Sequence, residues 1–531
     1  MSGKIHDLLG VGIGPFNLGL ACLAEPLEID AVFLDAREGF AWHHGLMFDD
    51  ATIQVPFLAD LVTLADPTSP YSFLSYLKEV GRLYPFYIRE NFQPLRSEYD
   101  AYCRWASERV GGLRWGREVV DVRRETAPGT GGGRADGTDD EDGPVYRVTA
   151  ITSDGTETYR ARHLVLGIGT TPWSPVDTSS LDQQPLAPDP LDQQPLDPDP
   201  LSPSPRVALH AADYLHRRED LLRLDSVTVV GSGQSAAEVY YNLLASAADH
   251  GPRVDWITRS PRFFPMEYTK LTLEMTSPEY IDHFHGLDAD TRDRMLRDQR
   301  SLYKGINADL INEIHDLLYR RSARGLDNGL LVAATALEDA TVADTGIRLA
   351  LRCNDTGRAW EHHTDGLVIA TGYSPTAPRF LDGIASEIDW EESGPGHTPA
   401  GRPRRYRVAR DHTVDLAHRY VHVQNAEEHT HGLSAPDLGM GAMRNSVILR
   451  GVTGREPYPV EPAIAFQQFG APTHRPAPTP APATPPSTPT PPPTPPPNAT
   501  PTAPRATAPT PTPTRTAPRT APATTQAQEA R

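Results

Sequence analysis

Apolar runs that end in a glycine turn recur along this chain, and they predict the strands of parallel sheets. The first lies in DLLGVGIGPFNL, which begins at Asp7, and an apolar segment of helical length follows it from Leu18 to Leu23. A second apolar run, Ala31 to Leu34, ends in Asp35. A strand, a glycine turn, a helix and a strand in this order predict a βαβ unit at the start of the chain.

The same order of elements returns near the middle of the chain. The run SVTVVGSGQSAAE begins at Ser226 and continues with helical spacing, and the next apolar run, Val254 to Thr258, ends in Arg259. A third run, DGLVIATGY, begins at Asp365 and again ends in glycine, and we interpret it as the return of the chain to the first domain. We therefore predict an α/β fold with two Rossmann-like dinucleotide-binding domains.

The patterns between these runs predict smaller elements. Aromatic residues at helical spacing from Tyr71 to Arg109 predict core helices, and Met266 to Arg324 predicts a small, polar helical region that caps the site. Alternating residues in Arg117 to Val122 and in Val145 to Ala150 predict an antiparallel hairpin.

Two proline-rich segments are predicted to be disordered. Residues 177–205 contain the acidic repeat LDQQPLAPDP and LDQQPLDPDP, and residues 471–531 are almost entirely Pro, Thr and Ala. Proline breaks helices, and such compositions bury too little apolar surface to offset the entropy of ordering. The predicted organisation is a first domain built from residues 1–176 and 351–470, a second domain with the helical region at 206–350, and the two disordered segments.

Composition restricts the partners and the compartment. The chain has 531 residues and a formal net charge of -19, which argues against nucleic acids and anionic membranes as partners. No apolar run approaches the roughly 20 residues that span a bilayer, and no signal peptide is apparent, so we expect a cytoplasmic protein. Its 3 cysteines form no CxxC pair, which excludes a redox dithiol and with it a pyridine-nucleotide disulfide oxidoreductase. The sequence leaves open whether the protein forms a homo-oligomer.

The two glycine turns indicate two nucleotide sites. Glycine lets the backbone approach a pyrophosphate, and the helix N-terminus that follows offers free N–H groups. Asp35 stands where an acid would hold a ribose, and Arg259 stands where a guanidinium would bind the 2′-phosphate that distinguishes NADP from NAD. A surface arginine is the alternative interpretation of Arg259. The pair of sites implies a flavoprotein that NADPH reduces.

Side chains after the second strand are candidates for contact with the flavin ring. Trp42, His43 and Gln54 could stack on a flat ring or hydrogen-bond to it, whereas an aromatic cluster that closes a domain core is the alternative. His429 and His431 lie close in sequence, but no third ligand stands at metal-site spacing, and we predict no metal.

Five motifs, found between Lys4 and Gly470, are specific in combination: GVGIGPFNLGL, IQVPFLADLVTLADPTSPYSF, GSGQSAAE, DGLVIATGY and HGLS. By these motifs the chain resembles the lysine/ornithine N-monooxygenases, flavin-dependent N-hydroxylases of siderophore biosynthesis. The resemblance implies FAD in the first site, NADPH in the second, and a flavin hydroperoxide that transfers one oxygen atom of O2 to a small-molecule primary amine.

The resemblance also implies roles for individual residues. Gln54 would approach the flavin ring, Ser434 would border the substrate, and Lys304 and Asn307 would lie near the reacting atoms. The residues expected to line FAD are Gly10, Gly12, Gly14, Pro15, Asn17, Val120, Gly432 and Leu433. Those expected to hold NADPH are Gly231, Ser232, Gly233, Gln234, Ser235 and Arg259.

One motif departs from the members that hydroxylate amino acids. Those relatives carry a lysine in FLKDL, whose ammonium binds the α-carboxylate of the substrate, but this chain has FLADL with Ala59, and Leu273 replaces an asparagine of their head-group pocket. A carboxylate buried there without a cation would cost on the order of several kcal/mol. The sequence therefore favours a diamine, cadaverine or putrescine. The alternatives are L-lysine N6- or L-ornithine N5-hydroxylation, with Lys270 or Lys304 as the cation, and, more remotely, a non-catalytic nucleotide-binding scaffold.

Overall fold

The structure, a computed structural model, describes residues 4–125, 143–182, 206–247, 251–391, 405–461 and 463–471. These residues belong to one unit, Met1–Pro472. Almost all of the predicted disordered tail and most of the predicted insertion lie outside the described residues. No helix in the described part of the chain is long and apolar enough to cross a membrane.

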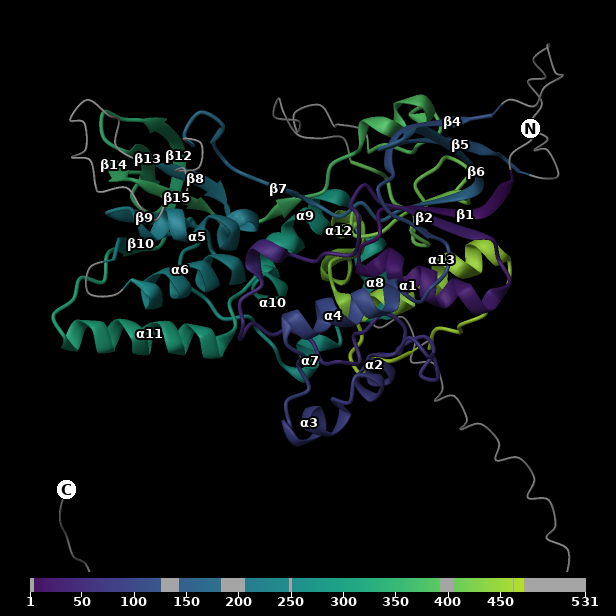
Figure 1. The fold of residues 1–531 in the computed structure, drawn as a ribbon, viewed down its shortest axis with the longest axis horizontal. Coiled ribbons are helices and arrows are strands. Elements are labelled where there is room, and N and C mark those ends of the chain that lie inside the picture. Colours follow the sequence, from purple (N-terminus) through teal and green to yellow (C-terminus); the bar gives the residue numbers. More distant parts are fainter. Residues whose placement is uncertain are drawn as a thin grey trace, which may run out of the picture. The chain divides into compact units, whose positions relative to one another are not determined.

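The first sheet forms around the N-terminal strand, as the sequence predicts (Figure 1). Its seven strands are β1 (Ile5–Val11), β2 (Ala31–Leu34), β3 (Leu113–Arg114), β4 (Glu118–Arg124), β5 (Tyr146–Thr152), β6 (Gly155–Leu166) and β17 (Val421–Val423). The order is β3-β2-β1-β6-β5-β4, and β17 pairs with the C-terminal end of β6. Strands β1, β2, β3, β6 and β17 run parallel, whereas β4 and β5 form the predicted antiparallel hairpin.

Helices from both ends of the chain share a hydrophobic core with this sheet. They are α1 (Pro15–Ala24), α2 (Phe73–Glu79), α3 (Leu83–Ile88), α4 (Arg96–Ser107) and α13 (Gly441–Thr453). Tyr99, Tyr102 and Trp105 of α4 are buried in the core beneath α1, which confirms the predicted aromatic helices. Helix α13 packs against α1, and Asn445 Nδ2 donates to the Phe16 carbonyl over 3.1 Å.

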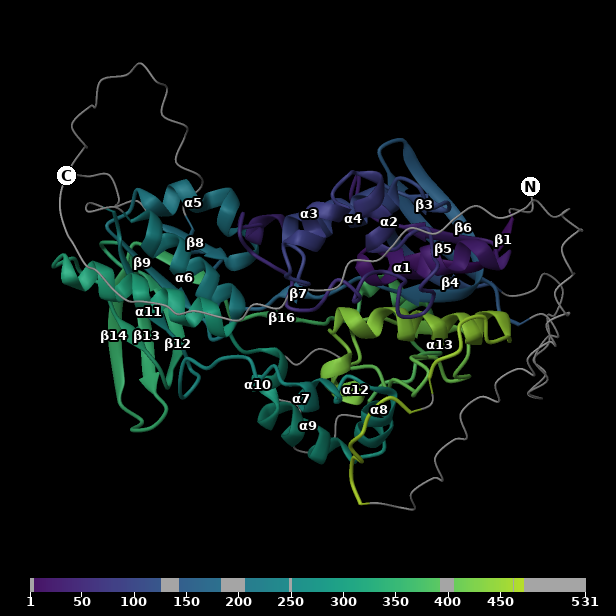
Figure 2. The same ribbon diagram turned by 90° about the horizontal axis from the view of Figure 1, so that it is seen from below.

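The second sheet is wholly parallel, with the order β11-β10-β9-β15-β8. Its strands are β8 (Val207–His210), β9 (Ser226–Val230), β10 (Arg253–Ile257), β11 (Leu331–Val332) and β15 (Gly366–Ile369). Its core is shared with α5 (Tyr214–Leu222), α6 (Gln234–Ser246) and α11 (Ala308–Ala323). A second core joins it to the antiparallel strands β12 (Thr335–Val342), β13 (Ile347–Cys353) and β14 (Ala359–Thr364), seen opposite α5 and α6 in Figure 2.

The run DGLVIATGY corrects one sequence-based interpretation. Its strand, β15, lies between β9 and β8 in the second sheet, so it does not return the chain to the first domain, and the boundary predicted at residue 350 is too early. Four consecutive buried apolar residues suit a central parallel strand of either sheet, so the pattern alone does not choose between them. The return follows β16 (Tyr373–Ser374), which pairs with β7 (Thr171–Pro172).

The predicted helical region is confirmed. It contains α7 (Lys270–Leu273), α8 (Pro278–His285), α9 (Ala289–Asp298) and α10 (Arg300–Tyr303), which precede α11. Tyr280 and Phe284 of α8 form a small core with Leu433, next to α12 (Glu428–His431). These helices therefore pack the second domain against the returning part of the first domain.

The described beginning of the predicted insertion is anchored to the second domain. Leu181 is 0% exposed, and Asp182 accepts hydrogen bonds from the Ala208 N–H over 3.3 Å and from Arg217 over 3.1 Å. The segment expected to be dispensable therefore begins after Asp182.

We expect a chain lacking residues 183–205 and 472–531, with a short Gly-Ser linker at the first deletion, to keep its FAD content and turnover, because these compositions cannot add a core. Flavin absorbance and amine-dependent NADPH oxidation measure the effect. Extending the first deletion back to residue 177 serves as the control: it removes Leu181 and should cost about 2–5 kcal/mol of stability. Loss of FAD or aggregation of the shorter deletion would contradict the prediction.

Candidate active site

The first glycine turn leaves room for a ligand at the N-terminus of α1. Gly12 has a φ of 86°, and a Cβ on it would lie 2.5 Å from the Gly167 carbonyl oxygen. A Cβ on Gly14, the N-cap of α1, would meet no atom within 4 Å, and Pro15 follows as the first helical residue. The first turn of a helix leaves N–H groups without intrahelical acceptors. The open side of Gly14 and these donors fit the pyrophosphate of FAD.

Asn17 fastens this turn to the sheet. Its side chain is fully buried, and Nδ2 donates to the carbonyls of Gly12 over 2.7 Å and Val11 over 3.2 Å. Its Oδ1 accepts from Gln424 Nε2 over 2.7 Å. Asn17 therefore acts on the predicted FAD site by holding the shape of the turn.

Asp35, at the end of β2, is tied to the same turn. Its Oδ2 accepts from the Ile13 N–H over 2.7 Å, and both carboxylate oxygens accept from Arg37. Burial alone would raise the pKa of Asp35, but the hydrogen bonds from Arg37 and Ile13 outweigh it and lower the pKa. Asp35 is thus an anion at neutral pH that stiffens the turn. No motif in the sequence marks Arg37, although it stands only two residues after the predicted acid.

The candidates for contact with the flavin ring differ in their surroundings. Gln54 Nε2 is buried without a hydrogen-bond partner, as expected of a donor reserved for a ring oxygen or nitrogen. Trp42 packs against the Tyr99 ring, as in the core-closing alternative. Burial and the nearby Arg96 lower the pKa of His43 to about 4, so its imidazole is neutral at pH 7. Val120 is exposed at an irregularity of β4.

A buried ion pair links the two domains beside these residues. Arg96 of α4 donates to Glu238 of α6 over 2.8 Å and to the Leu46 carbonyl over 2.5 Å. Glu238 also accepts from Gln234 Nε2 over 2.9 Å, and the Gln234 side-chain oxygen accepts from the Asn307 N–H over 2.8 Å. Helix α4 of the first domain is therefore bonded to α6, the helix that follows the second glycine turn.

The second turn, like the first, packs one glycine against a backbone carbonyl and uses another as the helix N-cap. A Cβ on Gly231 would lie 2.3 Å from the Ala370 carbonyl oxygen, and Gly233 is the N-cap of α6. Lys304 and Asn307 reach this turn: a Cβ on Gly233 would lie 3.4 Å from the Lys304 carbonyl oxygen. The Asn307 side chain caps α11 by accepting from the Asp309 N–H over 2.8 Å.

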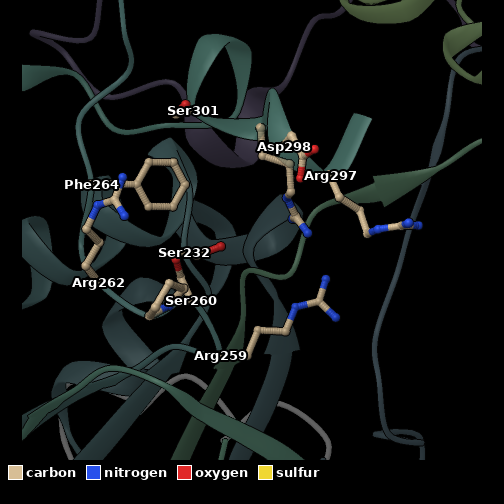
Figure 3. Close-up of a pocket in the computed structure, with 10 residues that line it drawn as sticks. Ser232, Arg259, Ser260, Arg262, Phe264, Arg297, Asp298 and Ser301 are labelled. Carbon is tan, nitrogen blue, oxygen red and sulfur yellow. The ribbon is translucent and has the colours of Figure 1, made fainter. Parts of the chain in front are cut away.

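A basic cavity of about 320 Å³ opens beside the second turn (Figure 3). It is lined by Ser232, Arg259, Ser260, Pro261, Arg262, Phe264, Arg297, Asp298, Arg300 and Ser301. Burial and the neighbouring Arg300 lower the pKa of Arg259, as expected where cations gather without matching anions. Four arginines and one aspartate give the cavity a net positive charge, which suits a phosphate group. The cavity therefore fits the 2′-phosphate end of NADPH. No sequence pattern predicts that Arg262, Arg297 and Arg300 join Arg259 here.

Glu428 holds the cation of the YKGIN stretch. Its Oε1 accepts from Lys304 Nζ over 2.6 Å and from the Tyr303 hydroxyl over 2.5 Å. The three residues join α10 to α12. Lys304 is consequently neutralised by a carboxylate of the protein.

The HGLS stretch sits on a second buried ion pair. Gly432 has a φ of 66°, Leu433 packs on α8, and the Ser434 hydroxyl donates to the His431 carbonyl over 2.6 Å. Arg444 of α13 donates to the Ala435 carbonyl over 2.6 Å and lies 3.0 Å from Glu427 Oε1. The pair thus holds the backbone of this stretch.

Across the described ranges no group of His, Cys, Asp or Glu could hold a metal ion.

The two residues that replace polar groups of the amino-acid pocket lie on separate segments. Ala59 is buried beside Gly439, and a Cβ on Gly439 would lie 3.6 Å from the Ala59 Cβ. Leu273 ends α7 and is 36% exposed.

Comparison with known proteins agrees with this geometry. The profile of the family described as L-lysine 6-monooxygenase/L-ornithine 5-monooxygenase matches residues 4–187 and 191–375. Putrescine N-hydroxylase of Shewanella oneidensis is 42% identical over 468 residues, which cover 88% of this chain and 84% of that protein.

Solved structures show the same likeness. FAD-bound DfoA, the cadaverine monooxygenase of desferrioxamine biosynthesis from Erwinia amylovora, superposes with a TM-score of 0.77 at 45% identity, covering 89% of this chain and 100% of that one. The ornithine N-hydroxylase KtzI of Kutzneria sp. 744, with reduced FAD, NADP+ and L-ornithine, has a TM-score of 0.70 at 26% identity, covering 85% and 99%. The chain therefore belongs to the L-lysine 6-monooxygenase/L-ornithine 5-monooxygenase family of FAD- and NADPH-dependent enzymes.

Proposed function

We propose that this enzyme N-hydroxylates one terminal primary amine of a diamine, cadaverine or putrescine, for the biosynthesis of a hydroxamate siderophore. The observation that carries the proposal is Ala59, a buried methyl group where the amino-acid hydroxylases have a lysine. An amino-acid substrate would leave its α-carboxylate without that cation, whereas a diamine has no such group to satisfy.

Neither of the two candidate cations, Lys304 and Lys270, is held in a buried site like that of Ala59. Lys304 is bonded to Glu428 over 2.6 Å, and releasing it to a substrate would leave that carboxylate unpaired. Lys270 is the exposed first residue of α7. The similarity to a putrescine N-hydroxylase and to a cadaverine monooxygenase supports the same conclusion.

The residues of the chain have defined tasks in this reaction. Bound FAD and NADPH supply the electrons and the group that carries oxygen. Gln54 offers a donor to the ring, Arg259 and its neighbours bind the NADP phosphate, and the glycine turns receive the two pyrophosphates. An alkyl amine has a reference pKa of about 10.4, so the pocket must favour the neutral amine by desolvation. We place the enzyme in the cytoplasm.

The proposal predicts the order of substrates. We expect kcat/KM for cadaverine or putrescine to exceed that for L-lysine and L-ornithine by about 10- to 100-fold, equivalent to roughly 1.4–2.7 kcal/mol. The measurement is amine-dependent NADPH oxidation together with assay of the hydroxylamine product, because oxidation alone also reports uncoupled turnover.

Two outcomes would overturn the proposal. L-lysine or L-ornithine hydroxylated as efficiently as the diamines would identify an amino-acid hydroxylase, and the variant Lys270→Ala would then test the exposed cation. Absence of FAD and of turnover with every amine would favour the non-catalytic scaffold.

A further inference from the structure

An acidic side chain lies beside the position where the relatives have their lysine. Asp437 caps the short helix η6 (Leu438–Met440), and its Oδ1 accepts from the Gly439 N–H over 2.7 Å. A Cβ built on Gly439 would lie 2.9 Å from Asp437 Oδ1 and 3.6 Å from the Ala59 Cβ. Ala59, Asp437 and Gly439 therefore form one cluster, in which Gly439 places no side chain against the carboxylate.

Tyr268 borders the same cluster from the segment that leads into α7. Burial and the nearby carboxylate of Asp437 raise the pKa of the Tyr268 hydroxyl. The segment before Leu273 thus also reaches Asp437, which brings together the two parts of the sequence that differ from the amino-acid hydroxylases.

Asp437 has no cation of its own among the described residues. None of their Lys, Arg or His side chains forms an ion pair with it, and the neighbouring Arg444 is engaged by Glu427 and by the carbonyls of Ser434 and Ala435. Burial raises the pKa of Asp437, and the N–H groups of Gly439 and Met440, together with the positive charge of the nearby Arg444, offset this only in part. A carboxylate held in this way would gain from a cationic ligand.

We propose that Asp437 binds the second, non-reacting ammonium of the diamine and so determines the substrate class. This inference rests on the proposed function. The distal pocket of the amino-acid hydroxylases places a lysine cation against a carboxylate of the substrate. Here the polarity is reversed, because the protein supplies the carboxylate and the substrate supplies the cation.

The variant Asp437→Asn tests this role with little change of shape. Asparagine keeps a side-chain oxygen for the Gly439 N–H, so the cap of η6 is retained. We expect KM for cadaverine to rise at least tenfold, while kinetics with n-pentylamine, which lacks the second ammonium, stay within twofold of the parent enzyme. Asp437→Glu, which restores the charge, should recover part of the loss.

A matched control separates this effect from general loss of negative charge. Asp66 accepts a hydrogen bond from the Thr68 N–H on the loop after the FLADL motif and lies outside the cluster. Asp66→Asn should therefore leave the preference for cadaverine over n-pentylamine unchanged. Flavin content and KM for NADPH, measured for every variant, report whether the cofactor sites are intact.

A second arm uses the position of Ala59. A lysine placed there would meet Asp437, so Ala59→Lys alone should block diamines without creating a site for lysine. The double variant Ala59→Lys/Asp437→Asn should raise kcat/KM for L-lysine at least tenfold above Ala59→Lys, because its new cation is free to bind the α-carboxylate.

The failure of this inference can be distinguished from failure of the proposed function. If the parent enzyme prefers diamines and Asp437→Asn keeps the full preference for cadaverine over n-pentylamine, Asp437 does not bind the ammonium. If the parent enzyme prefers L-lysine or L-ornithine, the proposed function itself is wrong. Equal losses for cadaverine and n-pentylamine, with flavin content retained, would also overturn the inference.

Discussion

Glu427→Gln is expected to lower the free energy of unfolding by about 3–5 kcal/mol, the usual cost of breaking a buried ion pair from one side. Glu427 is 0% and Arg444 1% exposed, and their side chains lie 3.0 Å apart. Burial and the positive charge of Arg444 hold the pKa of the adjacent His412 well below its usual value, so this histidine is neutral and adds no charge to the pair. Because this pair holds the HGLS backbone, FAD content should fall as well.

Urea denaturation, followed by intrinsic fluorescence and by release of flavin, measures the effect. The matched control is Glu361→Gln, which breaks the exposed pair with Arg348, 3.4 Å apart, and should cost less than about 1 kcal/mol. Similar losses in the two variants would show that burial of Glu427 does not govern the stability of this region.

Arg259→Ala is expected to weaken binding of NADPH by about 1.5–3 kcal/mol, the range for a hydrogen bond to a charged group. This corresponds to roughly a 10- to 150-fold rise in Kd. NADH, which lacks the 2′-phosphate, should be affected less than about twofold. Titration of the FAD-loaded enzyme with each nucleotide gives both values directly.

The same strand supplies the control for this variant. Arg253 begins β10 and is bonded to Asp255 over 2.9 Å, away from the cavity that Arg259 lines at the other end of the strand. Arg253→Ala should therefore leave both nucleotides unaffected. Equal weakening of NADPH and NADH by Arg259→Ala would mean that Arg259 does not read the phosphate.

Local patterns predicted the family, the α/β fold class, the enzyme class and the cofactors FAD and NADPH, and the comparisons confirm all of these. They succeed because each glycine turn, its strand and its helix are consecutive in sequence, so the nucleotide site is encoded within a short segment. The individual roles predicted for the site residues stay predictions. Asn17 illustrates why: its motif position is evident, but its bonds to Gly12 and Gln424 depend on the folded sheet.

Features built from distant segments could not be predicted. The basic cavity combines Arg259 with Arg297 and Arg300, which precede α11 and show no motif. The role proposed for Asp437 depends on its nearness to Ala59 in the folded chain. The apolar pattern of β15 does not specify which of the two sheets the strand joins. In each case a tertiary contact, rather than a local preference, gives the residue its role.

Strand β17 lies far from the other strands of its sheet in the sequence, and this determines the order in which the two domains can fold during synthesis. All strands of the second sheet lie between Val207 and Ile369, whereas the first sheet must wait for Val421–Val423. Until those residues leave the ribosome, the C-terminal end of β6 keeps an unpaired edge, which is open to wrong partners. The hydrogen bond between Asn17 and Gln424, 407 residues apart, is therefore among the last that a nascent chain can form.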